Sequence, residues 1–414
     1  MPIVIQKFGG SSVATPASRE IAISRVLHAR QEGYSVVVVV SAMGRMGDPY
    51  ATDTLISLVN NDGACLKGRD LDLVLACGEI ISAGVFTAKL RQHCKAIMLT
   101  GRQAGIVTDR VHGDARIVNV HPDRVQQLLA DGYVVVVAGF QGACADGEIT
   151  TLGRGGSDTT AVALGVALGA EVVEIYTDVA GIMTADPRIV PEAKVLAFVD
   201  YQEMLQMAYE GAKVVHSRAV EMAMHNNTRL VVRSPANEHT GTVITTATSY
   251  EGRRSYPVVS VAYRVDLVQI VVQPQIADAS FDCRLFNALA EHGVSVDLIN
   301  VSPKNKTFVV DAHLLGRAQS ALDQLPAERK IRAGCSKVSV VGVGMRGLPG
   351  IMSTVCRSLY EAGVEILQTS DSHMTISCLV DQSQLVTAVN ALHQEFRLAE
   401  LGSIAEPALV TSKS

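Results

Sequence analysis

Two glycine-rich loops carry the side chains best suited to bind an anion or take part in a reaction. The first of them reads KFGGSS. It places Lys7 ahead of Gly9 and Gly10, followed by the hydroxyl of Ser11. Glycines let an anion approach backbone N–H groups closely, and the ammonium of a nearby lysine supplies positive charge for a phosphate. The order differs from that of a P-loop, in which the lysine follows the glycines. The segment indicates either another kind of phosphate-binding loop or a glycine turn beside a solvated lysine.

The second loop, TTLGRGGSD at residues 150–158, runs directly into an apolar, alanine-rich segment. Arg154 stands between glycines, and its planar guanidinium suits a carboxylate or a phosphate. A helix that begins here would add unpaired N–H groups and a partial positive charge. The alternative is an ordinary loop in which Ser157 caps the helix. Two cationic loops at the same edge of a sheet would predict a site for an anionic substrate.

The residues up to 246 alternate between β-branched runs and helical segments, and this pattern predicts the elements that hold the two loops. Strands are expected at residues 3–6, 34–41, 96–99, 133–140 and 171–177, and helices near 16–32, 70–92, 122–131 and 157–169. Such alternation is typical of a largely parallel sheet with helices on both faces, a layered α/β/α sandwich. Ligands of these folds bind beyond the carboxyl ends of the strands, where both glycine-rich loops would lie.

The C-terminal part of the chain contains an internal repeat. After a polar segment at 247–257, which we interpret as a linker, the chain matches itself at a shift of 70 residues, so that Gly293 aligns with Gly363. Each copy has the order strand, helix, strand, strand, helix, which is typical of a ferredoxin-like α+β unit. Two small modules are therefore expected after the α/β domain.

Composition and charge argue against several classes of function. The 414 residues are 48% hydrophobic with a net charge of −5 and no block of like charge, so neither a nucleic acid nor a membrane surface is expected as a partner. The longest apolar runs are far shorter than the roughly 20 residues of a membrane span, and the N-terminus lacks a secretory signal. The eight cysteines are scattered without CxxC spacing, which argues against a zinc site or a disulfide framework. We expect a cytoplasmic enzyme.

One motif points in a different direction. Gly342, Gly344 and Gly347 have the GxGxxG spacing of a dinucleotide site, with Asp371 further along the chain. The motif lies inside a single ferredoxin-like copy, and the aligned segment of the other copy, residues 272–277, has no such glycines. A loop shaped for a small regulatory ligand is the better interpretation.

Six segments, in order along the chain, resemble the motif set of the aspartate kinases, which are members of the amino-acid kinase family. They read KFGGSSVA, VVVSAMG, CGEIIS, VAGFQG, TTLGRGGSDTTA and IYTDVAGIMTADPR, and the C-terminal repeat resembles the paired ACT domains of that family. The resemblance spans essentially the whole chain. It implies an amino-acid kinase-like α/β/α sandwich over 1–246, followed by ferredoxin-like ACT modules over 258–328 and 336–403. It also implies that a strand at 256–263 is able to pair with the second module.

The resemblance implies roles for individual positions. Lys7 resembles the lysine that neutralises charge on the transferring phosphoryl group, and Asp158 resembles an aspartate near the substrate's amino group and the metal. The implied aspartate-binding shell, in which the arginine holds the α-carboxylate, consists of Ser41, Thr52, Glu79, Arg154 and Ser157. The implied ATP-binding residues are Lys7, Gly9, Gly10, Ser11, Thr177, Asp178, Arg188 and Lys213. ATP and Mg²⁺ are the cofactors expected, and no protein metal-ligand set is predicted.

Plainer interpretations exist for some of these positions. Glu79 would also fit a solvated helix residue, and Thr52 a helix cap. Asp186 precedes a proline, so it is left out of the predicted site as a residue that shapes a turn. No role follows from the sequence for Arg45 or Cys77.

The reaction implied is transfer of the γ-phosphoryl group of ATP to the side-chain carboxylate of L-aspartate, the first step of lysine, threonine, methionine and diaminopimelate biosynthesis. The acceptor carboxyl group has a reference pKa of about 3.9, so it is ionised at neutral pH and needs no general base. Catalysis would then rest on positioning and charge neutralisation. Two alternatives stay open: a kinase for another acidic acceptor, such as glutamate or N-acetylglutamate, and an amino-acid sensor without catalytic activity.

The duplicated C-terminal half has no catalytic task, so we expect it to bind a feedback amino acid: lysine, threonine or diaminopimelate. The loop GMRGLPG would offer backbone donors to the effector's carboxylate, and QTSDSH would offer side-chain oxygens to its ammonium. The predicted effector-binding residues are Met345, Gly347, Ile351, Ser370 and Asp371. Exposed sheet edges and apolar helix faces also predict a homo-oligomer, at least a dimer, paired through residues 258–403.

Overall fold

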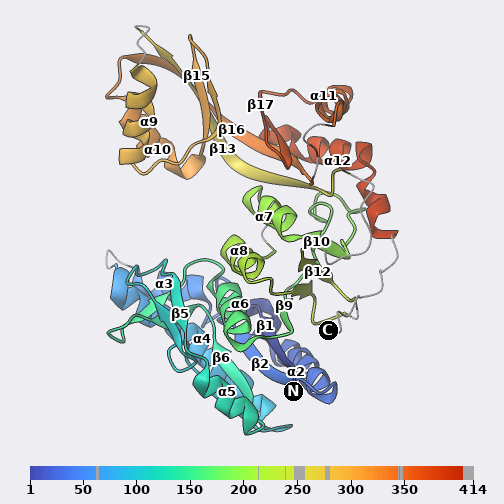
Figure 1. The fold of residues 1–414 in the computed structure, drawn as a ribbon. Coiled ribbons are helices and arrows are strands. Elements are labelled where there is room, and N and C mark those ends of the chain that lie inside the picture. Colours follow the sequence, from blue (N-terminus) through green and yellow to red (C-terminus); the bar gives the residue numbers. More distant parts are fainter. Residues whose placement is uncertain are drawn as a thin grey trace.

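The computed structural model describes residues 1–61, 65–212, 214–237, 239–246, 257–275, 280–343, 345 and 348–403 (Figure 1). An N-terminal α/β domain, drawn in blue to green, is followed by a C-terminal half in yellow to red. The segment 247–257, which the sequence predicts to be a linker, lies outside the described residues except for Pro257.

The N-terminal domain is built on an eight-stranded sheet with the order β10-β12-β11-β9-β1-β2-β6-β3. Its strands are β1 (Ile3–Phe8), β2 (Ser35–Val40), β3 (Ala96–Leu99), β6 (Val134–Ala138), β9 (Val172–Tyr176), β10 (Phe198–Asp200), β11 (Leu230–Arg233) and β12 (Thr242–Thr245). All neighbouring pairs are parallel except β11 with β12. The central strands are valine-rich because both faces of a parallel sheet are covered. The largely parallel sheet predicted from the alternating pattern is confirmed.

Helices cover both faces of this sheet. They are α1 (Gly10–Val13), α2 (Pro16–Gln31), α3 (Thr52–Val59), α4 (Gly68–Leu90), α5 (Asp123–Ala130), α6 (Gly156–Leu168), α7 (Tyr201–Tyr209) and α8 (Ser217–His225). Successive strand residues point to opposite faces, so Val4 packs into the core beneath α2 and α4, whereas Ile5 packs into the core beneath α5, α6 and α8. The expected α/β/α sandwich is therefore confirmed.

A second, four-stranded sheet extends from the same domain with the order β5-β4-β7-β8. Its short strands are β4 (Ile106–Thr108), β5 (Ile117–Val120), β7 (Gln141–Ala143) and β8 (Ile149–Thr151). β8 ends three residues before Arg154. This small sheet, which the sequence pattern does not predict, therefore fixes the approach to the second glycine-rich loop.

The two C-terminal copies share one six-stranded sheet with the order β14-β15-β13-β16-β18-β17 (Figure 1). The strands are β13 (Ser260–Pro274), β14 (Asp297–Val301), β15 (Lys306–Asp311), β16 (Ala327–Val341), β17 (Gln368–Asp371) and β18 (Thr375–Asp381). The helices are α9 (Phe281–Glu291), α10 (Leu315–Leu322), α11 (Ile351–Glu361) and α12 (Leu385–Glu395), with the 3₁₀ turns η2 (Ala312–Leu314), η3 (Gln382–Gln384) and η4 (Leu398–Ser403). The predicted order of strand, helix, strand, strand, helix occurs in both copies.

The long strand β13 joins the two copies. Its first part, residues 260–264, pairs with residues 337–341 of the second copy, and its second part pairs with β15 and with the first half of β16. The register shifts between Arg264 and Leu267, where Asp266 has a φ of 57°. The chain thus reaches the second copy before it builds the first.

Among the described helices, α4 alone has the length and apolar composition to cross a membrane, and half of its apolar stretch is buried within the protein. Two acidic residues, Asp72 and Glu79, are almost completely buried along it and bond to neighbouring loops. These features are those of a core helix.

Candidate active site

The loops that carry the predicted site residues lie together at the carboxyl ends of adjacent strands. β1 lies between β2 and β9, and Lys7 stands in register with Val39 on one side and Ile175 on the other. The loops after these three strands carry Gly9 and Gly10, Ser41, and Thr177 respectively. The carboxyl edge of the large sheet is therefore the place where the predicted site residues meet, as expected for a parallel sheet.

A buried ion pair joins the first loop to the helix that follows the second. The Nζ atom of Lys7 lies 2.7 Å from Oδ1 of Asp158, and the two side chains are only 12% and 9% exposed. Asp158 is in the first turn of α6, where a helix favours negative charge. Its Oδ1 atom faces the Lys7 ammonium, and the backbone N–H of His216 donates to Oδ2 at 3.3 Å. A lysine and a carboxylate are thus held together at the centre of the edge.

Glycine is required where the first loop meets the loop after β2. A Cβ atom on Gly10 would lie 2.6 Å from the carbonyl oxygen of Ala42, which is closer than real Cβ contacts. The backbone N–H of Gly44 donates to the Gly10 carbonyl at 3.1 Å, and that of Ser41 donates to Phe8 at 3.1 Å. Backbone of both loops is therefore packed together beside Lys7, with Ser11 exposed.

The second glycine-rich loop uses left-handed backbone to start α6. Gly153 and Gly155 have φ angles of 72° and 71°, a conformation that favours glycine. Gly155 is the N-cap, and the helix begins at Gly156, so the alternative of Ser157 as the cap is wrong. Arg154 is exposed, and within the described residues its guanidinium has neither a hydrogen-bond nor an ion-pair partner. The loop presents an unpaired cation next to the buried Ser157.

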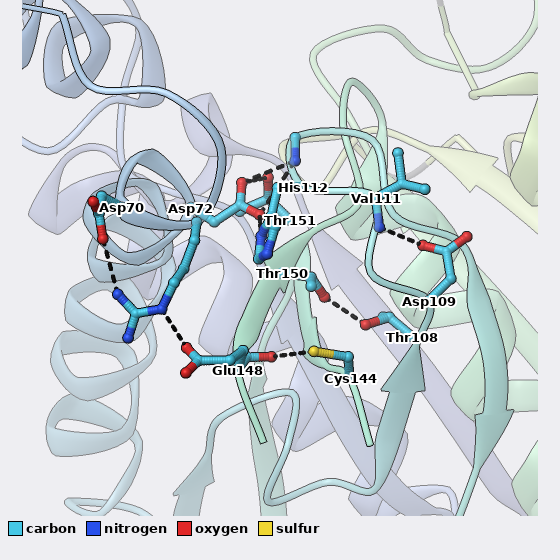
Figure 2. A network of polar contacts seen from close by, with 12 residues as sticks. Asp70, Asp72, Thr108, Asp109, Val111, His112, Cys144, Glu148, Thr150 and Thr151 are labelled. Atoms are coloured by element: carbon cyan, nitrogen blue, oxygen red, sulfur yellow. Dashed lines mark hydrogen bonds and ion pairs between the residues drawn. The ribbon is translucent and has the colours of Figure 1, made fainter. Parts of the chain in front are cut away.

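Figure 2 shows the polar contacts around Asp72, a buried carboxylate with a partner that lies close in sequence to this loop. Asp72 of α4 is fully buried and accepts hydrogen bonds from Thr151 Oγ1 at 2.5 Å, from the Gly113 N–H at 3.1 Å and from His112 Nδ1 at 2.8 Å. Thr151 ends β8, three residues before Arg154. The network therefore ties the core helix to the base of the loop, and sequence analysis missed it.

Glu79 lies two helical turns after Asp72 and therefore on the same face of α4. It is 2% exposed, so the alternative of a solvated helix residue is wrong. The Ala42 N–H donates to its Oε1 atom at 3.0 Å, whereas Oε2 is buried without a donor among the described residues. Burial raises the pKa of this carboxyl group to about 8. Oε2 of Glu79 is thus the carboxyl oxygen left to contact a ligand.

The loop after β2 also reaches the loop after β9. Arg45 is exposed, and its guanidinium lies 2.7 Å from Oδ2 of Asp178, whose Oδ1 accepts a hydrogen bond from Thr177 Oγ1 at 3.2 Å. Thr52 is the first residue of α3, after the N-cap residue Ala51, so it is not the cap. No role follows from the sequence for Arg45, yet it joins the loop after β2, which the resemblance assigns to aspartate, to the loop after β9, which it assigns to ATP.

A cavity of about 990 Å³ opens beside the segment that follows β9. Its lining from the N-terminal domain includes Thr177, Asp178, Asp186 and Arg188, together with the end of α7. The C-terminal half supplies the rest of the lining, residues 260–266 and 311–313. Lys213 lies outside the described residues, and its neighbours Ala212 and Val214 line the cavity.

The predicted effector-binding residues spread over the second copy. Met345 is 5% exposed and packs into the core, and Ile351 begins α11 after Gly350. Ser370 and Asp371 are exposed on the edge strand β17. Gly347 lies outside the described residues.

Buried polar contacts join the N-terminal domain, residues up to 246, to the C-terminal half, residues from 257. We call this contact region the domain boundary. Lys337 Nζ lies 2.9 Å from Glu210 Oε2 and 2.6 Å from Asp297 Oδ2. Ser339 Oγ donates to Glu210 Oε2 at 2.6 Å. Glu210 follows α7 directly, so the boundary reaches the cavity wall.

Comparison with known proteins places these features in context. The model of the amino acid kinase family matches residues 2–234, and an ACT domain model matches residues 330–394. Aspartokinase 1 of Bacillus subtilis is 44% identical over 404 residues, covering 97% of this chain and 100% of the relative.

Two crystal structures of E. coli aspartokinase III, each 24% identical to this chain, share its fold. The structure in complex with aspartate and ADP has a TM-score of 0.77, and the one in complex with lysine and aspartate has a TM-score of 0.71. Each match covers 95% of this chain and 99% of the other.

Proposed function

The chain belongs to the amino acid kinase family and, within it, to the aspartokinases, and from this premise we propose that it phosphorylates the side-chain carboxylate of L-aspartate. Membership makes it an ATP-dependent phosphotransferase that carries an ACT domain. The products of the proposed reaction are 4-phospho-L-aspartate and ADP. The proposed setting is the cytoplasmic biosynthesis of lysine, threonine, methionine and diaminopimelate.

The observation that carries the proposal is the buried pair of Lys7 and Asp158 at the carboxyl edge, 2.7 Å apart. A lysine ammonium has three N–H donors, so contact with one carboxylate leaves donors for phosphoryl oxygens. The backbone around Gly9 and Gly10 lies beside it. We infer that Lys7 neutralises charge on the γ-phosphoryl group as it moves from ATP to the acceptor, leaving ADP, because charge stabilisation is most effective in that transition state.

The acceptor end of the proposed site matches the three charges of aspartate. Arg154 offers a guanidinium fork to the α-carboxylate, and Glu79 offers its unpartnered Oε2 atom to the ammonium. Ser41, Thr52 and Ser157 supply hydroxyl groups around them. The side-chain carboxylate of the substrate is ionised at neutral pH, which fits a site that holds cations and donors rather than a general base.

The nucleotide is proposed to lie in the cavity beside the segment after β9, against Thr177, Asp178 and Arg188. Lys213 stays a proposed ATP-binding residue on the resemblance alone. The described residues contain no group of three or more metal-ligating side chains. Mg²⁺ usually binds through one or two carboxylates and the substrate's phosphates, and the candidate carboxylates here are Asp158 and Asp178. When bound, Mg²⁺ would neutralise phosphate charge.

Feedback control through the C-terminal half is the second part of the proposal. The E. coli aspartokinase III structure with lysine and aspartate is described as the T-state. We infer by analogy that lysine, threonine or diaminopimelate binds the ACT region here, with Met345, Gly347, Ile351, Ser370 and Asp371 as the candidate residues. Pairing of two chains through this half would place such a site at an interface.

A coupled ADP-release assay tests the function directly. ATP with L-aspartate should yield steady ADP formation, and ATP with L-glutamate or N-acetylglutamate should yield at most a slow background. A preference for glutamate or its N-acetyl derivative would replace the proposed acceptor. Binding of an amino acid without ADP formation from any of the three acceptors would indicate a sensor.

A further inference from the structure

The strand β13 of the C-terminal half touches the nucleotide segment at two points. The backbone N–H of Val261 donates to the carbonyl of Thr184 at 2.8 Å. Two residues further along the same strand, the hydroxyl of Tyr263 donates to Oδ2 of Asp186 at 2.8 Å. Tyr263 and Asp186 are 77 residues apart in the chain, so this contact exists only when the two halves are docked.

Asp186 in turn holds Arg188. The backbone N–H of Arg188 donates to Oδ1 at 2.9 Å, its Nε donates to the same oxygen at 3.0 Å, and its Nη2 donates to Oδ2 at 2.7 Å. Pro187 fixes the turn between them, and the N–H of Ile189 closes it on the Asp186 carbonyl at 3.0 Å. The carboxylate is 15% exposed, and the arginine alongside it keeps the pKa of this carboxyl group at about 2.

This arrangement presents the guanidinium to the cavity. The Arg188 side chain is 85% exposed although two of its nitrogens are fixed. A guanidinium has five N–H donors, and the contacts with Asp186 leave at least two nitrogen-bound donors free for phosphate oxygens. Holding the fork in place before the ligand arrives lowers the entropy cost of binding.

The other arginine of the cavity lining is differently placed. Arg264 lies 2.8 Å from Asp311 and 3.5 Å from Asp297, so two carboxylates of the C-terminal half neutralise it. Arg188 has one carboxylate partner, and that carboxylate is shared with a tyrosine hydroxyl from the other half. The cation best placed to meet an anion in this cavity is therefore Arg188.

We propose that Asp186 and Tyr263 are positioning residues for Arg188. Through the Tyr263 hydroxyl, the C-terminal half thereby raises the affinity of the enzyme for the phosphates of ATP. The inference rests on the proposed function in one respect, since it takes Arg188 to face the nucleotide. It adds that Tyr263, which lies outside the α/β domain, helps to fix the orientation of the Arg188 guanidinium through Asp186.

The test is the variant Tyr263→Phe, which removes one oxygen and keeps the ring. We expect the Kd of an ATP analogue, measured by calorimetric titration, and the KM for ATP to rise about fivefold, the size expected for the net contribution of one ordinary hydrogen bond that acts on the ligand indirectly. The KM for aspartate and kcat at saturating ATP should stay within twofold. Asp186→Asn should raise the KM for ATP further, about tenfold or more, and Asp186→Glu should recover part of the loss.

Tyr34→Phe is the matched control. Tyr34 also donates its hydroxyl to a carboxylate, Glu171 at 3.0 Å, but Glu171 lies at the amino end of β9, away from the carboxyl edge. This variant should bind ATP like the parent. Circular dichroism of each variant shows whether it is folded, and loss of fold in Tyr263→Phe would move the test to the Asp186 series.

The outcomes separate the two claims. Unchanged ATP affinity in Tyr263→Phe and Asp186→Asn, in an enzyme that phosphorylates aspartate, would overturn the positioning role alone. A chain that binds ATP with the expected variant effects but phosphorylates no acceptor would overturn the proposed function alone. A parent chain that binds no ATP would contradict both.

Discussion

Charged groups at the carboxyl edge and at the domain boundary are satisfied to very different degrees. At the edge, Arg154 has no partner within the described residues, and Glu79 Oε2 is buried without a donor. At the boundary, Lys337 contacts both Glu210 and Asp297, and a serine hydroxyl also donates to Glu210. A buried group without a partner, such as Glu79 Oε2, costs stability unless a ligand contacts it, and an exposed unpaired guanidinium is free to bind an anion, whereas mutual pairing holds two parts in a fixed arrangement. The edge is built to receive charge, and the boundary is built to hold position.

The largest expected effect comes from breaking the boundary. Lys337→Met removes the cation and leaves the buried Glu210 carboxylate with the Ser339 hydroxyl as its one remaining side-chain partner among the described residues, so the free energy of unfolding should fall by about 3 kcal/mol. Urea unfolding followed by circular dichroism measures it. Adding Glu210→Gln should recover part of the loss because no uncompensated charge then remains.

Lys89→Met is the control for that change, because Lys89 forms an exposed ion pair with Glu20. Exposed pairs contribute at most about 1 kcal/mol. Equal stabilities of the Lys337→Met and Lys89→Met variants would show that the boundary pair does not hold the halves together.

At the carboxyl edge, the largest effect is expected from Lys7→Met. If Lys7 neutralises charge mainly as the phosphoryl group moves, kcat should fall by about 10² to 10³, with smaller changes in either KM. Steady-state kinetics with both substrates varied measures this. Normal turnover would remove Lys7 from the mechanism, and Lys89→Met again serves as the lysine control.

A smaller effect on a different parameter is expected from Arg154→Ala. The KM for aspartate should rise about 10- to 100-fold with little change in the KM for ATP, and Arg154→Lys should recover little because a point charge does not reproduce the fork. Arg110→Ala, which removes an exposed arginine paired with Asp146, should leave both KM values unchanged. An unchanged KM for aspartate in Arg154→Ala would refute the assignment.

The smallest effect near neutral pH concerns Glu79. Its pKa is raised to about 8, so the free enzyme carries a neutral carboxyl group below that pH and must lose the proton to balance the substrate's ammonium. The kcat/KM for aspartate should therefore rise with pH towards about 8, by up to tenfold per pH unit on the acidic side. Glu79→Gln should give a lower and flatter profile, and a parent profile that is flat from pH 6 to 8 would contradict the role.

The sequence predicted the fold class because its strands are long buried runs, such as Val36–Val40, and its copies repeat in register at Gly293 and Gly363. The four-stranded sheet escaped prediction because its strands have three or four residues and each includes a polar residue, unlike the continuous apolar run of β3. The helix cap at Gly155 was missed because a left-handed glycine can begin a helix without a side-chain cap.

The sequence predicted the loop residues of the site but not the residues that hold those loops in place. Lys7 and Arg154 stand out because glycines surround them, and their proposed roles remain predictions. Asp72 could have been noticed as an acidic residue sharing a helix face with Glu79 in an apolar segment. The contact of Tyr263 with Asp186 could not, because only the docking of two distant segments creates it.

The central claim is that the carboxyl edge transfers a phosphoryl group to the side-chain carboxylate of L-aspartate. An acyl phosphate reacts with hydroxylamine to form a hydroxamate, so mass spectrometry of the quenched reaction identifies the acceptor directly. The account predicts the side-chain hydroxamate of aspartate from the parent enzyme with ATP and L-aspartate, and at least a hundredfold less of it from Lys7→Met. ADP formation without any aspartate hydroxamate, or an equal yield from Lys7→Met, would contradict it.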